Sequence, residues 1–178
     1  MQGTLIYLMG PSGSGKDSLI DVARESLLAQ GCYIAKRIIT RSRDAGGEDA
    51  EAVSVTEFAA LEAQGAFAMS WQANGLAYGI PKQIEAWLNA GHNVLVNGSR
   101  AYLPEAQLRF AKVRPILLTV NDEVLRKRLI ARGRESIEDI EARLSRNRTL
   151  QKPIPGVAIL DNSGALTDTV KALLALCA

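Results

Sequence analysis

The sequence contains little cysteine, a single histidine, few aromatic residues and almost no excess charge of either sign. Cys32 and Cys177 lie near opposite ends of the chain without C-x-x-C or metal-ligand spacing, so we expect two inert thiols in a reducing, cytoplasmic environment. A net charge of +2 gives the molecule too weak a field to gather nucleic acid or an anionic membrane by itself. The apolar N-terminal stretch is interrupted by Gly10 and lacks a basic leader, which predicts neither a signal peptide nor a membrane span.

Length and hydrophobic content predict a single domain over residues 1–178. With 47% hydrophobic residues the chain can bury a substantial core, but it is too short for two ordinary domains. Strand-like apolar runs alternate with helical periodicity, which predicts an α/β fold. We expect strands at residues 4–9, 33–39, 94–96, 115–120 and 157–160, with helices at 16–30, 57–63, 82–90, 104–111, 122–130, after Ser136, and at 166–176.

One glycine-rich stretch, Gly10-Pro11-Ser12-Gly13-Ser14-Gly15-Lys16-Asp17, separates the first expected strand from the first expected helix. The pattern G-x-x-x-x-G-K is typical of a phosphate-binding loop, because its glycines let successive backbone N–H groups converge on an anion at a helix N-terminus. Lys16 would reach the β- and γ-phosphates of a nucleotide as a compact positive charge. The alternative is an ordinary strand-to-helix turn, which the flanking strand and helix disfavour.

Asp17 stands where this motif expects Ser or Thr, whose hydroxyl would bind Mg²⁺. Ser18 is a poor substitute, because one helical step displaces its hydroxyl by about 100°. A carboxylate is an oxygen ligand that Mg²⁺ accepts directly or through water, so we expect Asp17 to take the metal role. The alternative is a first-turn aspartate that only favours the helix dipole. The strand expected at 94–96 ends in Asn97 instead of a metal-positioning aspartate, as if the carboxylate had moved to Asp17.

Two polar segments follow expected strand ends, where open α/β sheets bind ligands. Residues 40–48 carry Arg41 and Arg43 in a glycine-rich context, and form either an acceptor-phosphate site or a solvated loop. The second segment is Asn97-Gly98-Ser99-Arg100. His92 precedes its strand, so we expect it on the surface at the opposite end of the sheet and not as a general base.

Residues 53–78 are less regular and predict an inserted subdomain. A short helix at 57–63 is expected, with small strands near 67–71 and turns at Gly75 and Gly79. Trp71 and Tyr78 could stack on a base or touch a phosphate, or they could form the core of the subdomain.

Arginines cluster in the stretch that follows the fourth expected strand. Arg128 and Arg132 lie four residues apart on one helix face, and Arg143 and Arg146 form a second pair on the helix that Ser136 is expected to cap. Such a run can be a solvated charged face or a nucleic-acid surface, but the lack of interleaved aromatic residues argues against single-strand stacking. Because guanidinium groups suit phosphate oxygens, we expect a lid that closes on bound phosphates.

These residues resemble the guanylate-kinase-like branch of P-loop kinases over nearly the whole chain. Within that branch the chain is similar to the ribose 1,5-bisphosphate phosphokinase family of phosphonate degradation, through the phosphate loop with Asp17, Ile39-Thr40-Arg41, Ala73-Asn74-Gly75, Tyr78-Gly79 and Val94-Leu95-Val96-Asn97-Gly98-Ser99-Arg100. The resemblance implies a five-stranded parallel sheet in the order 2-3-1-4-5. Its core would cover residues 1–39, 81–131 and 152–178, with an acceptor subdomain at 40–80 and an arginine lid at 132–151.

The resemblance further implies transfer of the ATP γ-phosphoryl group to ribose 1,5-bisphosphate, which gives 5-phosphoribosyl 1-diphosphate. Together with the motifs it predicts ATP and Mg²⁺ as cofactors and a small phosphorylated sugar as substrate. The expected nucleotide site is residues 10–17, with Asp17 as metal ligand. The expected catalytic residues are Lys16, Arg128, Arg132 and Arg143, and the expected acceptor ligands are Arg41, Tyr78, Asn97, Ser99 and Arg100, with Arg43 as a further candidate.

The chain departs from guanylate kinases where those enzymes hold the base. They use an acidic side chain in the segment resembling 67–69, where this chain has Met69, and hydroxyls that Ala50 and Ile80 do not offer. Each unpaired buried N–H group of guanine would cost about 1 to 3 kcal/mol, so we expect an acceptor with phosphate but no base. Alternatives are a guanylate or other nucleoside-monophosphate kinase, a non-catalytic guanylate-kinase-like binding module, and a regulatory ATPase on nucleic acid. The sequence does not predict the oligomeric state.

Overall fold

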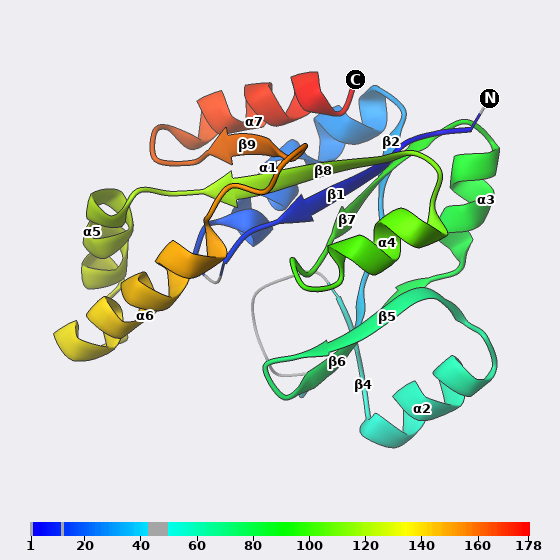
Figure 1. Ribbon diagram of the computed structural model, residues 1–178, viewed down its shortest axis with the longest axis horizontal. Helices are drawn as coiled ribbons and strands as arrows, with labels where there is room; N and C mark the ends of the chain where they lie inside the picture. Colours follow the sequence, from blue (N-terminus) through cyan, green and yellow to red (C-terminus); the bar gives the residue numbers. More distant parts are fainter. Residues whose placement is uncertain (1, 12, 43–49) are drawn as a thin grey trace.

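The computed structural model describes residues 2–11, 13–42 and 50–178, and its centre is a five-stranded sheet (Figure 1). The strands are β1 (Leu5–Met9), β2 (Cys32–Ile34), β7 (Asn93–Asn97), β8 (Val113–Thr119) and β9 (Ala158–Asp161). Their order is β2-β7-β1-β8-β9, which is 2-3-1-4-5 along the chain, so the predicted fold is confirmed. All pairings in this sheet are parallel, so the carboxyl ends of its strands meet at one edge, where ligands bind in such sheets.

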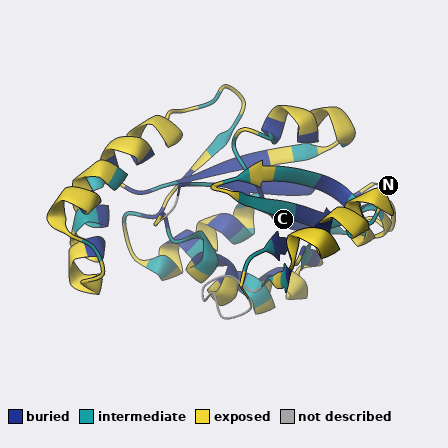
Figure 2. Ribbon diagram, turned by 90° about the horizontal axis from the view of Figure 1, so that it is seen from below, coloured by how far each residue is buried: buried dark blue, intermediate teal, exposed yellow. Residues whose placement is uncertain are grey.

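Helices cover both faces of this sheet. On one face α1 (Lys16–Ala29) and α7 (Leu166–Leu176) pack against Ile6 and Leu8 of the central strand. On the other face α3 (Gln83–Asn89) and α4 (Leu103–Arg109) pack against Leu5, Tyr7 and Met9. Burial on both faces explains why β1 is apolar throughout instead of alternating with polar residues. The strands in the interior are buried and the outer sides of the helices are exposed (Figure 2).

The buried face of α1 is narrow. Leu19, Ala23 and Leu27 are buried, whereas the apolar residues Val22 and Leu28 are 55% and 47% exposed. No helix in the described ranges has the length and hydropathy needed to span a membrane.

The strand expected at residues 33–39 is wrong, because the chain changes sheets inside it. The amide of Ala35 makes the last bond to the central sheet, at Leu95 O, and Lys36 and Arg37 follow. The next strand, β3 (Ile38–Thr40), pairs with β4 (Glu51–Val53) and β6 (Leu76–Pro81) in a second sheet. Two consecutive cationic side chains would be costly in a strand that is covered on both faces, which accounts for the exit at this point.

The second sheet has the strand order β4-β3-β6-β5, where β5 is Phe67–Ala73. Its small core contains Ile38, Val53 and Phe58, with the Phe67 ring packed against them. The helix α2 (Val55–Ala63) starts two residues earlier than predicted, because Ser54 and Glu57 form a capping box there. The sheet therefore begins at Ile38 and ends at Pro81, close to the limits expected for the insertion.

The two glycines expected at turns of this subdomain have different roles. Asn74 and Gly75 both have positive φ, 53° and 75°, and make the tight turn between β5 and β6. Gly79 lies within β6, so its predicted turn is wrong. A Cβ there would lie 2.6 Å from the Phe67 ring, so the close approach of that ring is what requires glycine.

Two helices extend beyond the carboxyl edge of the central sheet, α5 (Asp122–Arg132) and α6 (Ile137–Leu150) (Figure 1). They pack against each other through a core of their own, formed by Val120, Leu125, Leu129, Ile140 and Leu144. Ser136 Oγ accepts a hydrogen bond from the Asp139 amide at 3.1 Å, so the predicted N-cap of α6 is confirmed.

The two cysteines meet in the core although they are far apart in sequence. Cys32 in β2 and Cys177 after α7 are both free and buried. A hydrogen bond between the two thiols, together with burial, raises the pKa of Cys177, and the same bond lowers the pKa of Cys32.

His92, which was expected on the surface, is half-buried and packs edge-on against the Tyr33 ring.

Candidate active site

The glycine-rich loop leaves the end of β1 and enters α1, as the motif requires. Gly13 and Gly15 have φ of 85° and 92°, a left-handed conformation that side-chain-bearing residues rarely adopt. The Ser14 amide bonds Pro11 O at 3.1 Å, which closes a turn within the loop. Ser12 lies outside the described residues. These turns direct the loop backbone toward the N-terminus of α1, the position where a phosphate is bound in such loops.

A network of buried hydrogen bonds joins the loop to the segment after β9 and to α7. Asn162, after β9, donates from Nδ2 to Ser14 O at 2.9 Å, and its Oδ1 accepts from Thr169 Oγ1 of α7 at 2.7 Å. Asn162 is 4% exposed, and a Cβ on Gly15 would lie 2.6 Å from its Nδ2. Gly15 is therefore needed both for its φ and for the close approach of this asparagine.

The loop also contains a polar atom that a ligand could satisfy. Ser14 Oγ is buried and has no hydrogen-bond partner among the described residues. A buried hydroxyl without a partner is costly, and a hydroxyl that can donate suits an anionic oxygen. The residues of the loop thus fit a bound phosphate.

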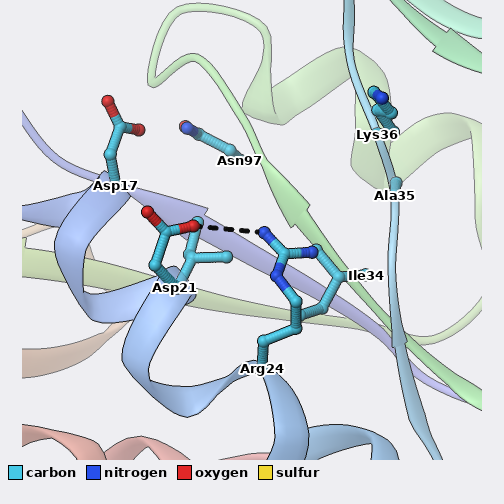
Figure 3. Close-up of a pocket in the computed structure, with 8 residues that line it drawn as sticks. Asp17, Asp21, Arg24, Ile34, Ala35, Lys36 and Asn97 are labelled. Atoms are coloured by element: carbon cyan, nitrogen blue, oxygen red, sulfur yellow. Dashed lines mark hydrogen bonds and ion pairs between the residues drawn. The ribbon is translucent and has the colours of Figure 1, made fainter. Parts of the chain in front are cut away.

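Lys16 and Asp17 begin α1 and face the end of β7. Lys16 Nζ donates to Asn97 Oδ1 at 3.0 Å. Asp17 and Asn97 also line a small pocket together with Asp21, Arg24 and Lys36, and both point into the same space (Figure 3). Acidic, amide and basic groups meet there, which suits a phosphorylated ligand and a hard cation.

Tyr78 belongs to a layered stack of side chains beside this pocket. The Arg37 guanidinium lies 4.7 Å from the centre of the Tyr78 ring. Tyr78 stacks on Trp71 with ring centres 5.8 Å apart, and Trp71 stacks on Tyr102 at 5.3 Å. Burial raises the pKa of Tyr102. The alternatives left open for Trp71 and Tyr78 thus resolve in part, because the rings pack on each other and Tyr78 also faces a cation.

The segment after β7 is fixed by the core beneath it. Tyr7 Oη donates to Ser99 O at 2.7 Å, and a Cβ on Gly98 would lie 2.2 Å from the Tyr7 ring. Burial raises the pKa of Tyr7 well above its ordinary range. Arg100 Nη1 donates to Leu150 O at 2.6 Å, so this side chain reaches the end of α6. Asn97 is brought to Lys16, whereas the Arg100 guanidinium contacts the end of α6.

Arg41 follows β3 and is half-buried. Because Ile39 pairs with Tyr78, Arg41 lies close to the Tyr78 strand in the second sheet. Arg43 lies outside the described residues.

The arginines that the sequence assigned to a lid make different contacts. Arg132 and Arg143 both bond the Glu135 carboxylate, at 3.0 Å and 2.8 Å. Arg143 is also next to the phosphate loop, because its Nη1 would lie 3.7 Å from a Cβ on Gly13. Arg128 instead donates to Gly164 O at 3.3 Å, so Arg128 and Arg132 do not act on a common partner although they share a helix face. Arg146 is exposed.

Three structural contributors were not identified from the sequence. Arg37 was hidden because residues 33–39 were interpreted as one strand, although a cation directly after a strand end is a usable signal. Glu135 is the acidic residue that lies between Arg132 and Arg143 in the sequence and pairs with both, and its position between two arginines is a signal that could have identified it. Asn162 has no local signal, because its partners Ser14 and Thr169 are brought to it only by the fold.

Comparisons with known proteins identify the family. A family model described as an AAA domain matches residues 6–149. Over 176 residues the chain is 60% identical to ribose 1,5-bisphosphate phosphokinase PhnN of Pseudomonas paraeruginosa, covering 98% of this chain and 95% of that protein. The chain belongs to the ribose 1,5-bisphosphate phosphokinase family. PhnN proteins of Pseudomonas fluorescens and Agrobacterium fabrum are 56% and 45% identical, covering 98% and 96% of this chain and 94% and 93% of theirs.

Solved structures share the fold. Guanylate kinase of Anaplasma phagocytophilum superposes with a TM-score of 0.68 at 20% identity, covering 97% of this chain and 82% of that one. A gluconokinase of Sinorhizobium meliloti 1021 gives a TM-score of 0.53 at 16% identity, with coverages of 99% and 91%. The fold is therefore the guanylate-kinase-like α/β fold, and a nucleotide-using kinase architecture accompanies the phosphate loop.

Proposed function

We propose that the chain transfers the γ-phosphoryl group of ATP to ribose 1,5-bisphosphate and releases 5-phosphoribosyl 1-diphosphate and ADP. The observation that carries this proposal is 60% identity over 98% of the chain to a protein named for that phosphokinase activity. The site supports it independently, because a phosphate loop adjoins a pocket lined by charged side chains. Phosphonate catabolism in the cytoplasm is the proposed setting.

The acceptor side favours a sugar phosphate over a nucleotide. Met69 and Ile80 are paired on neighbouring strands, are 1% and 0% exposed, and offer only apolar or weakly accepting atoms. A guanine held at these positions would leave N–H groups unpaired, at about 1 to 3 kcal/mol each. Arg41 and Tyr78 are the proposed ligands of an acceptor phosphate, with Asn97 and Ser99 at the neighbouring strand end.

The proposed reaction needs no general base. An oxygen of the C1 phosphate forms a bond to the γ-phosphorus, the bond to the β–γ bridging oxygen breaks, and its electron pair leaves with ADP. The second pKa of a phosphate monoester is about 6, so the attacking oxygen is already anionic at neutral pH. The work left to the protein is alignment and charge stabilisation by Lys16 and the lid residues Arg128, Arg132 and Arg143.

Mg²⁺ is proposed to be held by Asp17, directly or through water. The carboxylate lines the pocket beside the Asn97 amide, and such oxygen donors are what this cation prefers. When bound, Mg²⁺ would neutralise charge on the transferred phosphoryl group.

A direct assay separates this function from its alternatives. The chain is incubated with ATP and Mg²⁺ and, in separate samples, with ribose 1,5-bisphosphate, ribose 5-phosphate or GMP, and a new diphosphate is followed by phosphorus NMR. We expect diphosphate from the bisphosphate at a rate far above the other two. A faster reaction with GMP would assign guanylate kinase activity instead, and no transfer to any acceptor would assign a binding module.

A further inference from the structure

The proposed acceptor carries two phosphates, and each needs a cationic partner. Arg41 and Arg100 were expected from the sequence as acceptor ligands, and Arg43, a further candidate, lies outside the described residues. The Arg100 guanidinium instead donates to Leu150 O at the end of the lid helix. Arg100 therefore contacts the end of α6 instead, and a second phosphate of the acceptor requires another cationic side chain near Asn97.

Arg37 occupies that position. It is half-buried where the chain passes from the central sheet to the second sheet, and its Nη1 donates to Asn97 O at 3.2 Å. The side-chain oxygen of the same Asn97 accepts from Lys16 at 3.0 Å. Arg37 and Lys16 thus contact one residue, which brings the guanidinium close to the end of the phosphate loop.

The orientation of Arg37 is also fixed. Its guanidinium stacks on Tyr78 at 4.7 Å, and Tyr78 in turn stacks on Trp71. A stacked guanidinium keeps its plane, so it can present a pair of N–H groups to phosphate oxygens with less ordering on binding. Lys36, the preceding residue, lines the pocket itself.

We propose that Arg37 is a specificity-determining residue that binds the C1 phosphate of the acceptor, the group that attacks the γ-phosphorus. Arg41, beyond the end of β3, then binds the distal C5 phosphate. This inference rests on the proposed function, since it assigns the two phosphates of that substrate. The attacking phosphate must lie within about 3.5 Å of the γ-phosphorus, so its partner must be the arginine that shares Asn97 with Lys16.

Arg37→Gln and Arg37→Lys test the assignment, with Arg109→Gln as the matched control. Arg109 also donates to a backbone oxygen, that of Ala68, but its other partner is Glu105 on its own helix, α4, whereas Arg37 contacts Asn97. For ribose 1,5-bisphosphate we expect Arg37→Gln to lower kcat/KM by about 10- to 100-fold, as for loss of a charged hydrogen bond, and Arg37→Lys to give a smaller loss. The control should stay within about threefold of the wild type.

A binding measurement distinguishes this role from a structural one. Ribose 5-phosphate lacks the C1 phosphate, so its calorimetric Kd in the presence of ADP should be unchanged by Arg37→Gln and weakened by Arg41→Gln. The KM for ATP and the Tm should stay near the wild-type values. Equal weakening of ribose 5-phosphate by both variants would overturn the assignment.

The two proposals fail in different ways. A wild-type protein that does not convert ribose 1,5-bisphosphate removes the proposed function. If the wild-type protein converts it and the kcat/KM values of Arg37→Gln and Arg37→Lys both stay within threefold of the wild-type value, only the role of Arg37 is removed. If Arg37→Gln does not fold, the Arg37→Lys variant alone tests the assignment. A loss of threefold or more in kcat/KM for ribose 1,5-bisphosphate, with an unchanged affinity for ribose 5-phosphate, would then support the role of Arg37.

Discussion

Lys16 Nζ donates a hydrogen bond to Asn97 Oδ1 at 3.0 Å, and the backbone oxygen of the same asparagine accepts from Arg37. Asn97 is 6% exposed at the end of β7, so its position is fixed by the sheet. The lysine of the phosphate loop is therefore held at the sheet edge before any nucleotide binds. Such prior ordering reduces the entropy that binding must otherwise cost.

Lys16→Met should lower phosphoryl transfer by at least about 10²-fold, because it removes the cation nearest the β- and γ-phosphates while keeping a side chain of similar length. The phosphorus NMR assay measures the rate, and the Tm reports folding. Lys171→Met on the exposed side of α7 is the control and should be neutral. Near-normal turnover of Lys16→Met would remove the phosphate-loop assignment.

Asp17→Asn should raise the Mg²⁺ concentration needed for half-maximal rate and lower the maximal rate. The reason is that an amide is a weaker ligand than a carboxylate for this cation. Asp168→Asn, which also removes a first-turn charge but from α7, should leave the Mg²⁺ titration unchanged. If both variants titrate like the wild type, Asp17 acts only on the helix dipole.

Glu135→Gln should lower kcat by about tenfold. Glu135 is 18% exposed and its carboxylate joins Arg132 to Arg143, so its loss leaves two guanidinium groups in mutual repulsion beside Gly13. Steady-state kinetics at saturating ATP measure the effect. Glu138→Gln, on the first turn of α6, is the control, and a kcat equal to the wild type in both variants would show that the bridge does not position Arg143.

Asn162→Ala should lower the free energy of unfolding by about 1 to 3 kcal/mol, because the buried Ser14 oxygen and the Thr169 hydroxyl each lose a partner. Urea denaturation measures this loss. The KM for ATP should also rise, because the phosphate loop loses the hydrogen bond from Asn162 to Ser14 O that holds its backbone. A destabilised variant with an unchanged KM would mean that the loop keeps its shape without Asn162.

Sequence periodicity predicts the central fold well because its signals are local. The range expected for α7, Leu166–Leu176, is the range observed, and the apolar run of β1 follows directly from burial on both faces. The phosphate loop is equally local, since its glycines and lysine are contiguous. The failure at residues 33–39 came from treating a cationic pair, Lys36 and Arg37, as strand interior.

The proposed acceptor side was harder to predict because its residues come from several elements. Tyr78 and Asn97 could be named from the sequence, but their common neighbour Arg37 is known only once two sheets are assembled. Long flexible side chains add to this difficulty. Arg100 follows a strand end as a ligand would, yet it reaches across 50 sequence positions to Leu150. No local pattern distinguishes these two uses of an arginine.

The support of Ser14 by Asn162 and Thr169 also bears on protein synthesis. The phosphate loop is made first, but its supporting residues are made nearly 150 positions later. Chains emerge from the ribosome N-terminus first, and β1 has neither of its neighbours until β7 and β8 are complete. A nascent chain thus contains the phosphate-loop sequence long before the residues that hold the loop in its folded conformation have been synthesised. Ample cellular ATP would stabilise the finished chain while leaving stalled fragments to the proteases.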